Sequence, residues 1–560
     1  MRITDELANL LRTALAEAER SGQLPSAGAV QPTIERPQHP EHGDYSSSVA
    51  LRLARTLRMA PMAIAERIAA AVPAHDAVAG VSVALPGFIN FVLADDWLAR
   101  QVDAIRTQGS TYGNVEIGGR KRIQVEFVSV NPTGDLHVGH ARGAVIGSGL
   151  ATLLDAAGFG VQREYYVNDG GNQMRTFVDT VYARYMQAAG HDVPLPELAY
   201  QGEGPQRLAE EILREDSGRL VPLPRDEAAR QLLPVVLRKV LASIRADLEQ
   251  LGVRYDNWFS EQGLLVDGTF DEAMRLLGER GYLVDREGAR WFTSTRLGED
   301  KDNVVVRSGG GGPTYFGTDI AYHYDKFIRR KFERVINVWG ADHHGHVARM
   351  KAVVEALGVD PDRLTIILNQ IVSFKQGALA VRFSKRKGQI VTVRELVDVV
   401  GPDACRYIFL SRSPDSQMEF DLELATKQSL DNPVFYVQYA HARIASVLRM
   451  AEERAVTWDD GDTSLLRHPL EMGLVRHILV LPDVVKLAAE RLEPHHIPRY
   501  AEELARAFTH FYDARDECRI LSSDPADLPV SKARLKLVDS ARVALARCLS
   551  LMGMTAPDRM

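Results

Sequence analysis

A strand–helix–strand pattern occurs twice in this chain, and it constrains the fold more than any other feature. The two units are expected at 122–130, 137–157 and 161–169, and at 334–341, 346–357 and 363–374. Two strands joined by a helix run parallel in one sheet, because the helix returns the chain to the end where the first strand began. The sequence therefore predicts an α/β fold with a Rossmann-like, doubly wound parallel sheet.

The rest of the chain divides into regions of different composition. With 560 residues the chain is too long for one hydrophobic core, so several domains are expected. Residues 1–110 predict a small α+β domain, and the α/β pattern occupies about 120–425. Within it, about 185–300 is mainly helical and polar, which indicates helical insertions. Strand patterns stop after about 430, so residues 430–560 predict an all-helical domain.

Composition excludes several classes of protein. The net charge of −7 argues against general coating of nucleic acid, although local basic patches can still bind a structured partner. Cys405, Cys518 and Cys548 lie far apart, which argues against a disulfide framework and a cysteine zinc site. The sequence has no 18-residue apolar run that would span a membrane. The acidic, amphipathic start lacks the features of a secretory signal, so a cytoplasmic protein is expected.

The segment "NPTGDLHVGHARG" follows the first strand and places His137 and His140 on either side of Gly139. The pair could bind a metal, lie passively near a helix cap, or handle phosphate. The spacing differs from the HExxH zinc helix, and no carboxylate lies between the histidines. A helix start after a parallel strand offers free N–H groups to an anion, and imidazoles there can donate to phosphate oxygens. Phosphate handling is the favoured interpretation.

Glycine recurs at every fourth position of the same helix, at Gly139, Gly143 and Gly147. This spacing leaves one helical face bare, so that another surface can approach closely. A closely packed sheet would explain Gly143 and Gly147 equally well, and only Gly139 points specifically to a ligand.

A second phosphate-binding element is expected at the carboxyl edge of the other half of the sheet. The segment "VRFSKRKGQIVT" at 381–392 places Ser384, Lys385 and Arg386 on a glycine-containing loop. A basic loop alone is usually a solvated surface turn. Its position opposite the histidine motif favours phosphate binding.

These motifs together resemble a known family. "HVGH" is similar to the HIGH signature of class I aminoacyl-tRNA synthetases, and "FSKRKG" is similar to their KMSKS loop. "SVNPTGDLHVGHAR", "YFGTDIAYHYDKF", "VWGADHHGH", "DNPVFYVQYAHARI" and the terminal "APDRM" extend the resemblance to arginyl-tRNA synthetases of the bacterial type over nearly the whole chain. The chain departs from many relatives at Arg382 and Phe383, where they have lysine and methionine.

The resemblance implies that ATP, with Mg²⁺, and L-arginine form arginyl-adenylate, and that the arginyl group passes to its tRNA. It further implies activation that needs bound tRNA, a monomer, no structural metal, and a C-terminal domain that binds the anticodon. His137, His140 and Lys385 would be catalytic. The implied ATP contacts are His137, Gly139, His140, Ser384, Lys385 and Arg386. A synthetase-like tRNA-binding protein with weak or no catalysis is the alternative.

The resemblance also implies an arginine pocket. Glu126, Tyr315 and Asp319 would hold the guanidinium, whose planar fork is best matched by carboxylates, and Asn131 would bind the amino and carboxylate groups. Glu126 could instead be a strand residue that faces solvent. Asp319 could instead be an N-terminal carboxylate that interacts favourably with the helix dipole. The complete implied set is Glu126, Ser129, Asn131, Tyr315, Asp319, Asp342 and His343.

The anticodon would be bound by the helix near 436–449, where Tyr439 and Arg443 lie on one face. Unpaired bases are typically read by stacking on aromatic or arginine side chains. The same stripe could equally form the core between helices. The resemblance implies that the N-terminal domain contacts the outer corner of the tRNA.

Overall fold

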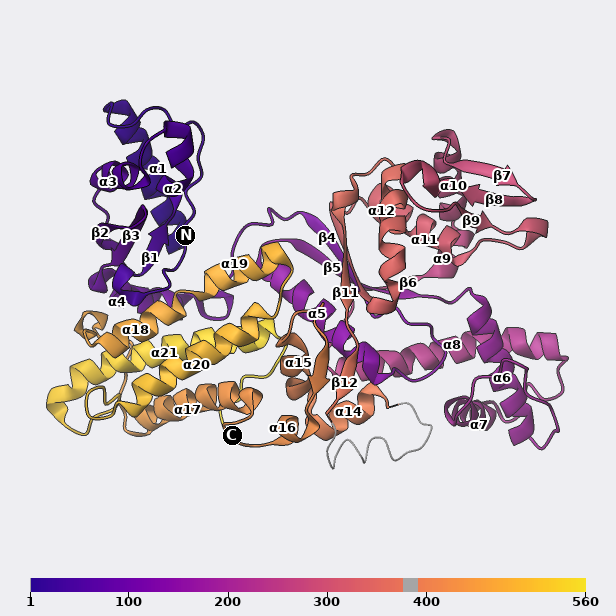
Figure 1. The fold of residues 1–560 in the computed structure, drawn as a ribbon. Coiled ribbons are helices and arrows are strands. Elements are labelled where there is room, and N and C mark those ends of the chain that lie inside the picture. The colour runs from indigo at the N-terminus through magenta and orange to yellow at the C-terminus, as the bar shows by residue number, and fades with distance from the viewer. Residues whose placement is uncertain (1, 376–390) are drawn as a thin grey trace.

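The computed structural model describes residues 2–375 and 391–560. Its central sheet has five parallel strands in the order β11-β10-β4-β5-β6 (Figure 1). These strands are β4 (Arg122–Phe127), β5 (Gly160–Val167), β6 (Asn257–Ser260), β10 (Arg334–Gly340) and β11 (Leu364–Asn369). From β4 the chain progresses outward through β5 to β6, whereas β10 leads to β11 on the other side. This reversal between β4 and β10 confirms the predicted doubly wound sheet.

The helices α5 (Ala141–Ala156) and α12 (Val347–Ala356) connect the strands as predicted. Apolar side chains line almost every side of α5, so the helix is buried between the sheet and the C-terminal helices. A β-carbon at Gly147 would overlap the ring of Phe127, whereas at Gly143 it would make only ordinary contact with Asn369. Close packing against β4 therefore explains Gly147.

Two expectations about the central region need correction. The strand predicted at 363–374 is two strands, because the chain leaves the sheet after β11, and β12 (Val372–Phe374) pairs with β13 (Met418–Phe420) instead. Between them Ile371 is 80% exposed, so an apolar run was mistaken for a continuous strand. The insertion expected at 185–300 is also interrupted, because β6 lies within it and belongs to the core sheet.

Two lobes project from the sheet on the right of Figure 1. One contains α6 (Asn172–Ala188), α7 (Gly204–Asp216) and α8 (Arg225–Gln250). The other contains α9 (Glu261–Val266), α10 (Thr269–Glu279), β7 (Leu283–Arg286), β8 (Ala289–Phe292), β9 (Asn303–Val306) and α11 (Tyr315–Tyr324). A π-helical turn, Asp325–Arg329, continues α11 and leads into β10.

The N-terminal region folds around an antiparallel sheet with the order β1-β3-β2. Its elements are α1 (Ile3–Arg20), β1 (Tyr45–Ser47), α2 (Val49–Leu57), α3 (Pro61–Ala70), β2 (Val78–Ala84), β3 (Phe88–Leu93) and α4 (Asp95–Gln108). This region stands above α18 (Pro469–Ile478) and α21 (Leu528–Leu551) in Figure 1 and contacts both through α4.

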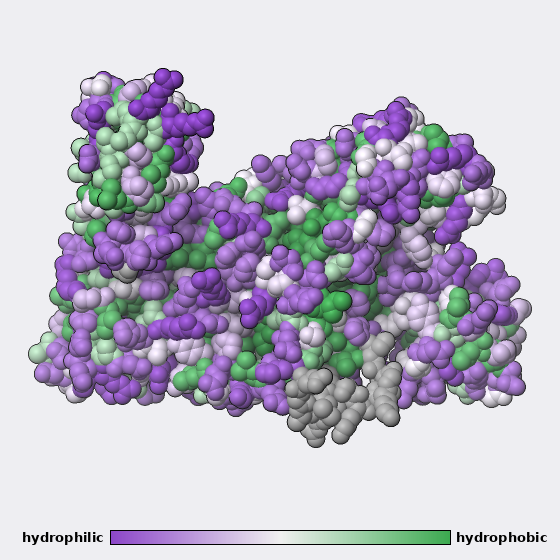
Figure 2. Space-filling model, viewed as in Figure 1, coloured by the Kyte–Doolittle hydropathy of each residue, from purple (hydrophilic) through white to green (hydrophobic). Residues whose placement is uncertain are grey.

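After β13, the described part of the chain contains helices and the loops that join them, and no strand. Its helices are α16 (Leu422–Thr426), α17 (Pro433–Glu453), α18 (Pro469–Ile478), α19 (Leu481–Arg491), α20 (His496–Asp513) and α21 (Leu528–Leu551), and α14 (Val393–Val400) and α15 (Pro402–Leu410) lead into them. No helix in the described part of the chain is long and apolar enough to cross a membrane. Figure 2 shows a largely hydrophilic face, with hydrophobic residues gathered toward the middle of the molecule.

Candidate active site

The turn after β4 has a strained backbone that neighbouring tyrosines hold in place. Val128 and Ser129 have positive φ angles of 70° and 47°, a region that is unfavourable for a β-branched residue. The hydroxyl of Tyr165 donates to the carbonyl of Val130 at 2.9 Å, and the Ser129 hydroxyl accepts from the Tyr166 amide at 3.1 Å. Strain of this kind is typical of a functional turn.

His137 and His140 lie where this turn enters the helix, as predicted. Nδ1 of His137 accepts from the Gly139 amide at 3.0 Å, and a β-carbon at Gly139 would come within 2.9 Å of that same nitrogen. The glycine thus makes room for the His137 ring. The two imidazole centroids lie 6.0 Å apart, and Nδ1 of His140 is buried with no hydrogen-bond partner among the described residues.

Both imidazoles are neutral near pH 7. Burial lowers the pKa of His137, and burial together with the neighbouring His137 lowers the pKa of His140, although Asp342 opposes this shift. Because Nδ1 of His137 accepts a hydrogen bond, its proton lies on Nε2, which is free to donate. The pair can therefore offer N–H groups to an anion without carrying charge beforehand.

The segment that follows the basic loop is hydrogen-bonded to the turn that carries His137, which we call the histidine turn. The Val138 amide donates to the Val391 carbonyl at 2.9 Å, and the Val393 amide donates to the Leu136 carbonyl at 2.8 Å. The downstream end of the loop is therefore fixed beside His137. The candidates on the loop itself lie outside the described residues: Arg382, Phe383, Ser384, Lys385 and Arg386.

Tyr315 and Asp319 lie on the first turns of α11, which begins at Tyr315 as expected. Tyr315 is 43% exposed, and its hydroxyl lies over Gly171. Burial, followed by the negative charges of Glu126 and Glu261, raises the pKa of Asp319 to about 7. This carboxyl group gains charge readily when a cation arrives, which suits a guanidinium ligand.

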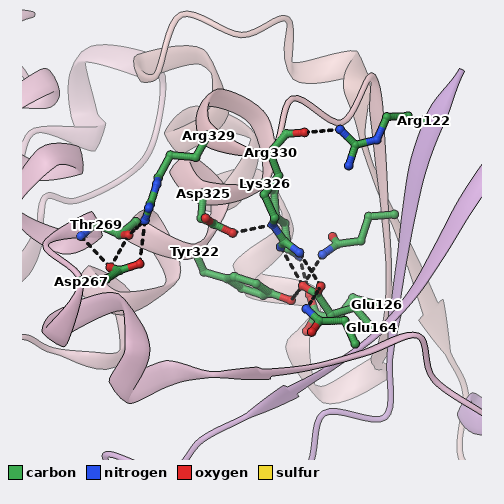
Figure 3. Close-up of polar contacts among 12 residues, drawn as sticks. Arg122, Glu126, Glu164, Asp267, Thr269, Tyr322, Asp325, Lys326, Arg329 and Arg330 are labelled. Carbon is green, nitrogen blue, oxygen red and sulfur yellow. Dashed lines mark hydrogen bonds and ion pairs between the residues drawn. The ribbon is translucent and has the colours of Figure 1, made fainter.

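Four polar side chains form a row across the sheet, from Asn337 on β10 through Glu126 and Glu164 to Asn257 on β6. They are partners in the strand register, so all four point to the same face. Glu126 is only 6% exposed and accepts from Nζ of Lys326 at 2.6 Å (Figure 3). The solvent-facing alternative for Glu126 is therefore wrong, and its carboxylate already faces a cation.

Glu164 was not identified from the sequence, although it also interrupts an apolar strand. It accepts from the hydroxyl of Tyr322 at 2.6 Å, from the amide of Asn257 at 2.7 Å and from Arg330 at 2.8 Å. Burial acts to raise the pKa of Glu164, but Arg330 and the hydrogen bonds lower it overall. A charged residue within an apolar strand was the signal that could have found it.

The remaining residues expected to bind arginine have different surroundings. Asn131 donates to the side chain of Gln173. Asp342 is 81% exposed, and its carboxylate lies 3.6 Å from His343. Its negative charge acts to raise the pKa of His140, against the effect of burial.

The two tRNA candidates lie together on α17. The guanidinium of Arg443 is 5.0 Å from the ring centre of Tyr439 and 4.6 Å from that of Tyr512, and all three side chains are half-buried. Tyr439 also stacks on Phe435. The sequence identified Tyr439 and Arg443 but not Tyr512, because Tyr512 comes from α20, about seventy residues later in the chain.

The fold and the family models that match the chain define its class. Residues 101–421 match the family described as tRNA synthetases class I (R), catalytic domain, and residues 437–560 match the DALR anticodon binding domain. Residues 5–93 match the arginyl tRNA synthetase N terminal domain. The chain is thus a class I aminoacyl-tRNA synthetase in its architecture.

Proteins of similar sequence identify the family within this class. The chain is 48% identical to an arginine–tRNA ligase of Dehalococcoides mccartyi over 98% of both chains, and 46% identical to one of Heliobacterium modesticaldum over 97% of both. An arginyl-tRNA synthetase structure from Thermus thermophilus shares the fold, with a TM-score of 0.74, 24% identity and coverage of 99% of this chain and 100% of that one. The chain belongs to the arginine–tRNA ligase family.

Proposed function

We propose that this chain, an enzyme of tRNA aminoacylation with arginine, works in two steps through arginyl-adenylate. A carboxylate oxygen of arginine attacks the α-phosphorus of ATP, and the bond to pyrophosphate breaks. A ribose hydroxyl of the terminal tRNA adenosine then attacks the arginyl carbonyl, and AMP leaves. Neither step needs a nucleophilic side chain, so catalysis consists of positioning and charge stabilisation.

The observation that carries the proposal is the histidine turn, to which Val391 and Val393 are hydrogen-bonded. His137 and His140 would donate to the phosphate oxygens as negative charge shifts toward pyrophosphate, and Lys385 would add a positive charge. ATP would enter as its magnesium complex. The exposed carboxylate of Asp342, near His140, is of the kind that Mg²⁺ binds.

The arginine side chain would reach the edge of α11. Asp319 would accept from the guanidinium fork, the Tyr315 hydroxyl would bind beside it, and Asn131 and Ser129 would contact the amino and carboxylate groups. Lysine has no fork, so it would leave buried acceptors unpaired and be rejected.

The C-terminal helices would bind the anticodon. Tyr439, Arg443 and Tyr512 offer two aromatic faces and a guanidinium plane on which an unpaired base can stack. The N-terminal region would contact the outer corner of the tRNA. We further propose that the protein acts as a monomer in the cytoplasm.

The first test is ATP–pyrophosphate exchange with each amino acid, with and without tRNA. We expect exchange with arginine alone, and only when tRNA is present. Exchange without tRNA would contradict the coupling to tRNA but keep the reaction. If no amino acid supports exchange, the protein is a synthetase-like tRNA-binding protein.

A second test isolates the phosphate role of the histidines. His140→Ala should slow exchange by about 10²- to 10³-fold, because a donor to the transition state is lost. Filter binding of tRNA should stay unchanged. His191→Ala, at an exposed position after α6, is the matched control. An unchanged exchange rate in His140→Ala would remove His140 from the phosphate site.

A further inference from the structure

The buried lysine beneath the arginine pocket has no part in the proposed reaction. Lys326 has 0% exposed surface and lies in the π-helical turn that continues α11. Its Nζ donates to Glu126 at 2.6 Å and lies 4.0 Å from the ring centre of Tyr322 (Figure 3). It also donates to Oδ1 of Asn337 at 3.1 Å. Burial of a lysine charge is costly unless such partners surround it, and π-helical turns are frequent at functional sites.

A chain of hydrogen bonds connects Lys326 to the backbone of Asp319. One ring nitrogen of His323, Nδ1, lies 2.8 Å from the Asp319 carbonyl, and the other, Nε2, lies 3.3 Å from Nδ2 of Asn337. Burial, helped by Lys326, lowers the pKa of His323 to about 3, so the ring is neutral. A carbonyl only accepts, so Nδ1–H donates to it and Nε2 accepts from Asn337. The amide oxygen of Asn337 is therefore left to face Lys326.

The charges around Asp319 come from several elements. Glu126 on β4 and Glu261 on α9 raise its pKa, in addition to burial, while Lys326 and Arg349 on α12 lower it. Tyr166 on β5 and His323 on α11 also face this region and are neutral near pH 7.

We propose that Lys326 is a positioning residue for arginine recognition, which neutralises Glu126 so that Asp319 is the carboxylate that receives the guanidinium. This rests on the proposed function and differs from the direct guanidinium contact that the resemblance implies for Glu126. Without Lys326, the unpaired charge of Glu126 would keep Asp319 protonated to higher pH and would compete for the incoming cation. With Lys326, the pocket presents one acceptor at a defined place.

The test measures kcat/KM for arginine in tRNA-supported exchange between pH 6 and pH 9. In the unaltered protein we expect this value to rise with pH and level off above about 7, because arginine binding must displace the Asp319 proton. Lys326→Met should move the midpoint upward by about one pH unit or more, because a nearby cation is lost. The KM for ATP should not change. Lys351→Met, on the outer part of α12, is the control.

Two further variants keep the inference falsifiable if Lys326→Met does not fold. Glu126→Gln leaves the lysine charge uncompensated, so the midpoint should move downward. Glu126→Gln with Lys326→Met removes both charges, so the midpoint should return toward that of the unaltered protein, and kcat/KM should recover relative to Lys326→Met.

The outcomes separate this inference from the proposed function. If Lys326→Met folds and keeps the original midpoint, or if Glu126→Gln leaves it unchanged or higher, the inference is wrong. A double variant that binds arginine worse than Lys326→Met would show that Glu126 itself holds the guanidinium. If the unaltered protein shows no exchange with arginine, the proposed function fails instead.

Discussion

The molecule buries cations in two different ways. Beneath the proposed arginine pocket, Lys326 and Arg330 face the carboxylates of Glu126 and Glu164. Elsewhere, Arg142 and Arg406 are buried as fully as Lys326, whereas Arg330 is 20% exposed. Neutral oxygens receive the hydrogen bonds of Arg142 and of Arg406, and Arg406 lies at the junction with the C-terminal helices.

Arg406 on α15 joins four parts of the chain. Its guanidinium donates to the carbonyls of Met552 at 2.5 Å, Leu251 at 3.1 Å and Gly252 at 3.2 Å, and to the Ser148 hydroxyl at 3.2 Å. These acceptors lie at the ends of α21 and α8 and in the middle of α5. Burial lowers the pKa of Arg406 to about 10, which still leaves it charged at neutral pH.

The difference concerns what each kind of site can do. A carboxylate titrates, so an ion pair near a ligand can change its charge when the ligand or a proton arrives. A carbonyl does not titrate, so an arginine held by carbonyls simply fixes chain segments to one another. We therefore expect changes at the junction to act on stability, and a change at Asp319 to act mainly on arginine.

The largest effect should come from Arg406→Met. This variant keeps much of the buried volume but leaves three carbonyls without a donor, which should lower the free energy of unfolding by about 3–5 kcal/mol. Urea unfolding followed by tryptophan fluorescence measures the change. Arg275→Met, which breaks an exposed ion pair, should stay within about 0.5 kcal/mol. Equal effects of the two variants would contradict the comparison.

Much of the fold could be predicted because periodicity reports burial directly. The parallel sheet and the helical C-terminal region both follow from it. The errors occur where an apolar pattern does not reveal which element the residues form. β12 looks like the end of β11 because both are apolar, and the sequence does not show that the chain turns at Gln370, whose carbonyl accepts from Arg142. β6 was missed because its four residues are too short to show a period.

The candidate site was predictable only where one residue carries the signal. His137 and His140 lie three residues apart in the chain, which is a recognisable spacing. Lys326 pairs with Glu126, which lies two hundred residues earlier in the chain. Only the tertiary fold brings the two side chains together. The position of Lys326 seven residues after Asp319, on the same helical face, was the available hint.

After Arg406→Met, Asp319→Asn should have the next largest effect. This effect should fall on the use of arginine and not on stability. Loss of the acceptor charge should lower kcat/KM for arginine by about 100-fold, or about 2.7 kcal/mol, with far less change in the KM for ATP. Stability should not fall, because the change removes a buried carboxylate that is costly to ionise. Asp271→Asn, on the exposed side of α10, serves as the control. Equal effects on arginine and ATP would place Asp319 outside the arginine pocket.

Glu164→Gln should have the smallest effect, because glutamine still accepts from Tyr322 and Arg330 keeps its ion pair with Asp325. We expect a loss of about 1–2 kcal/mol at pH 7, since hydrogen bonds to a charged group become neutral ones. The pKa of Glu164 is lowered in the folded state, so its stabilisation is present above its unfolded value near 4.3 and disappears as pH falls through the folded value. Urea unfolding at pH 7, 5.5 and 4 should therefore show the difference between the two proteins narrowing toward low pH. A difference that stays constant would mean that the Glu164 carboxylate, unlike its neighbours in the pocket, behaves like the carbonyls around Arg406.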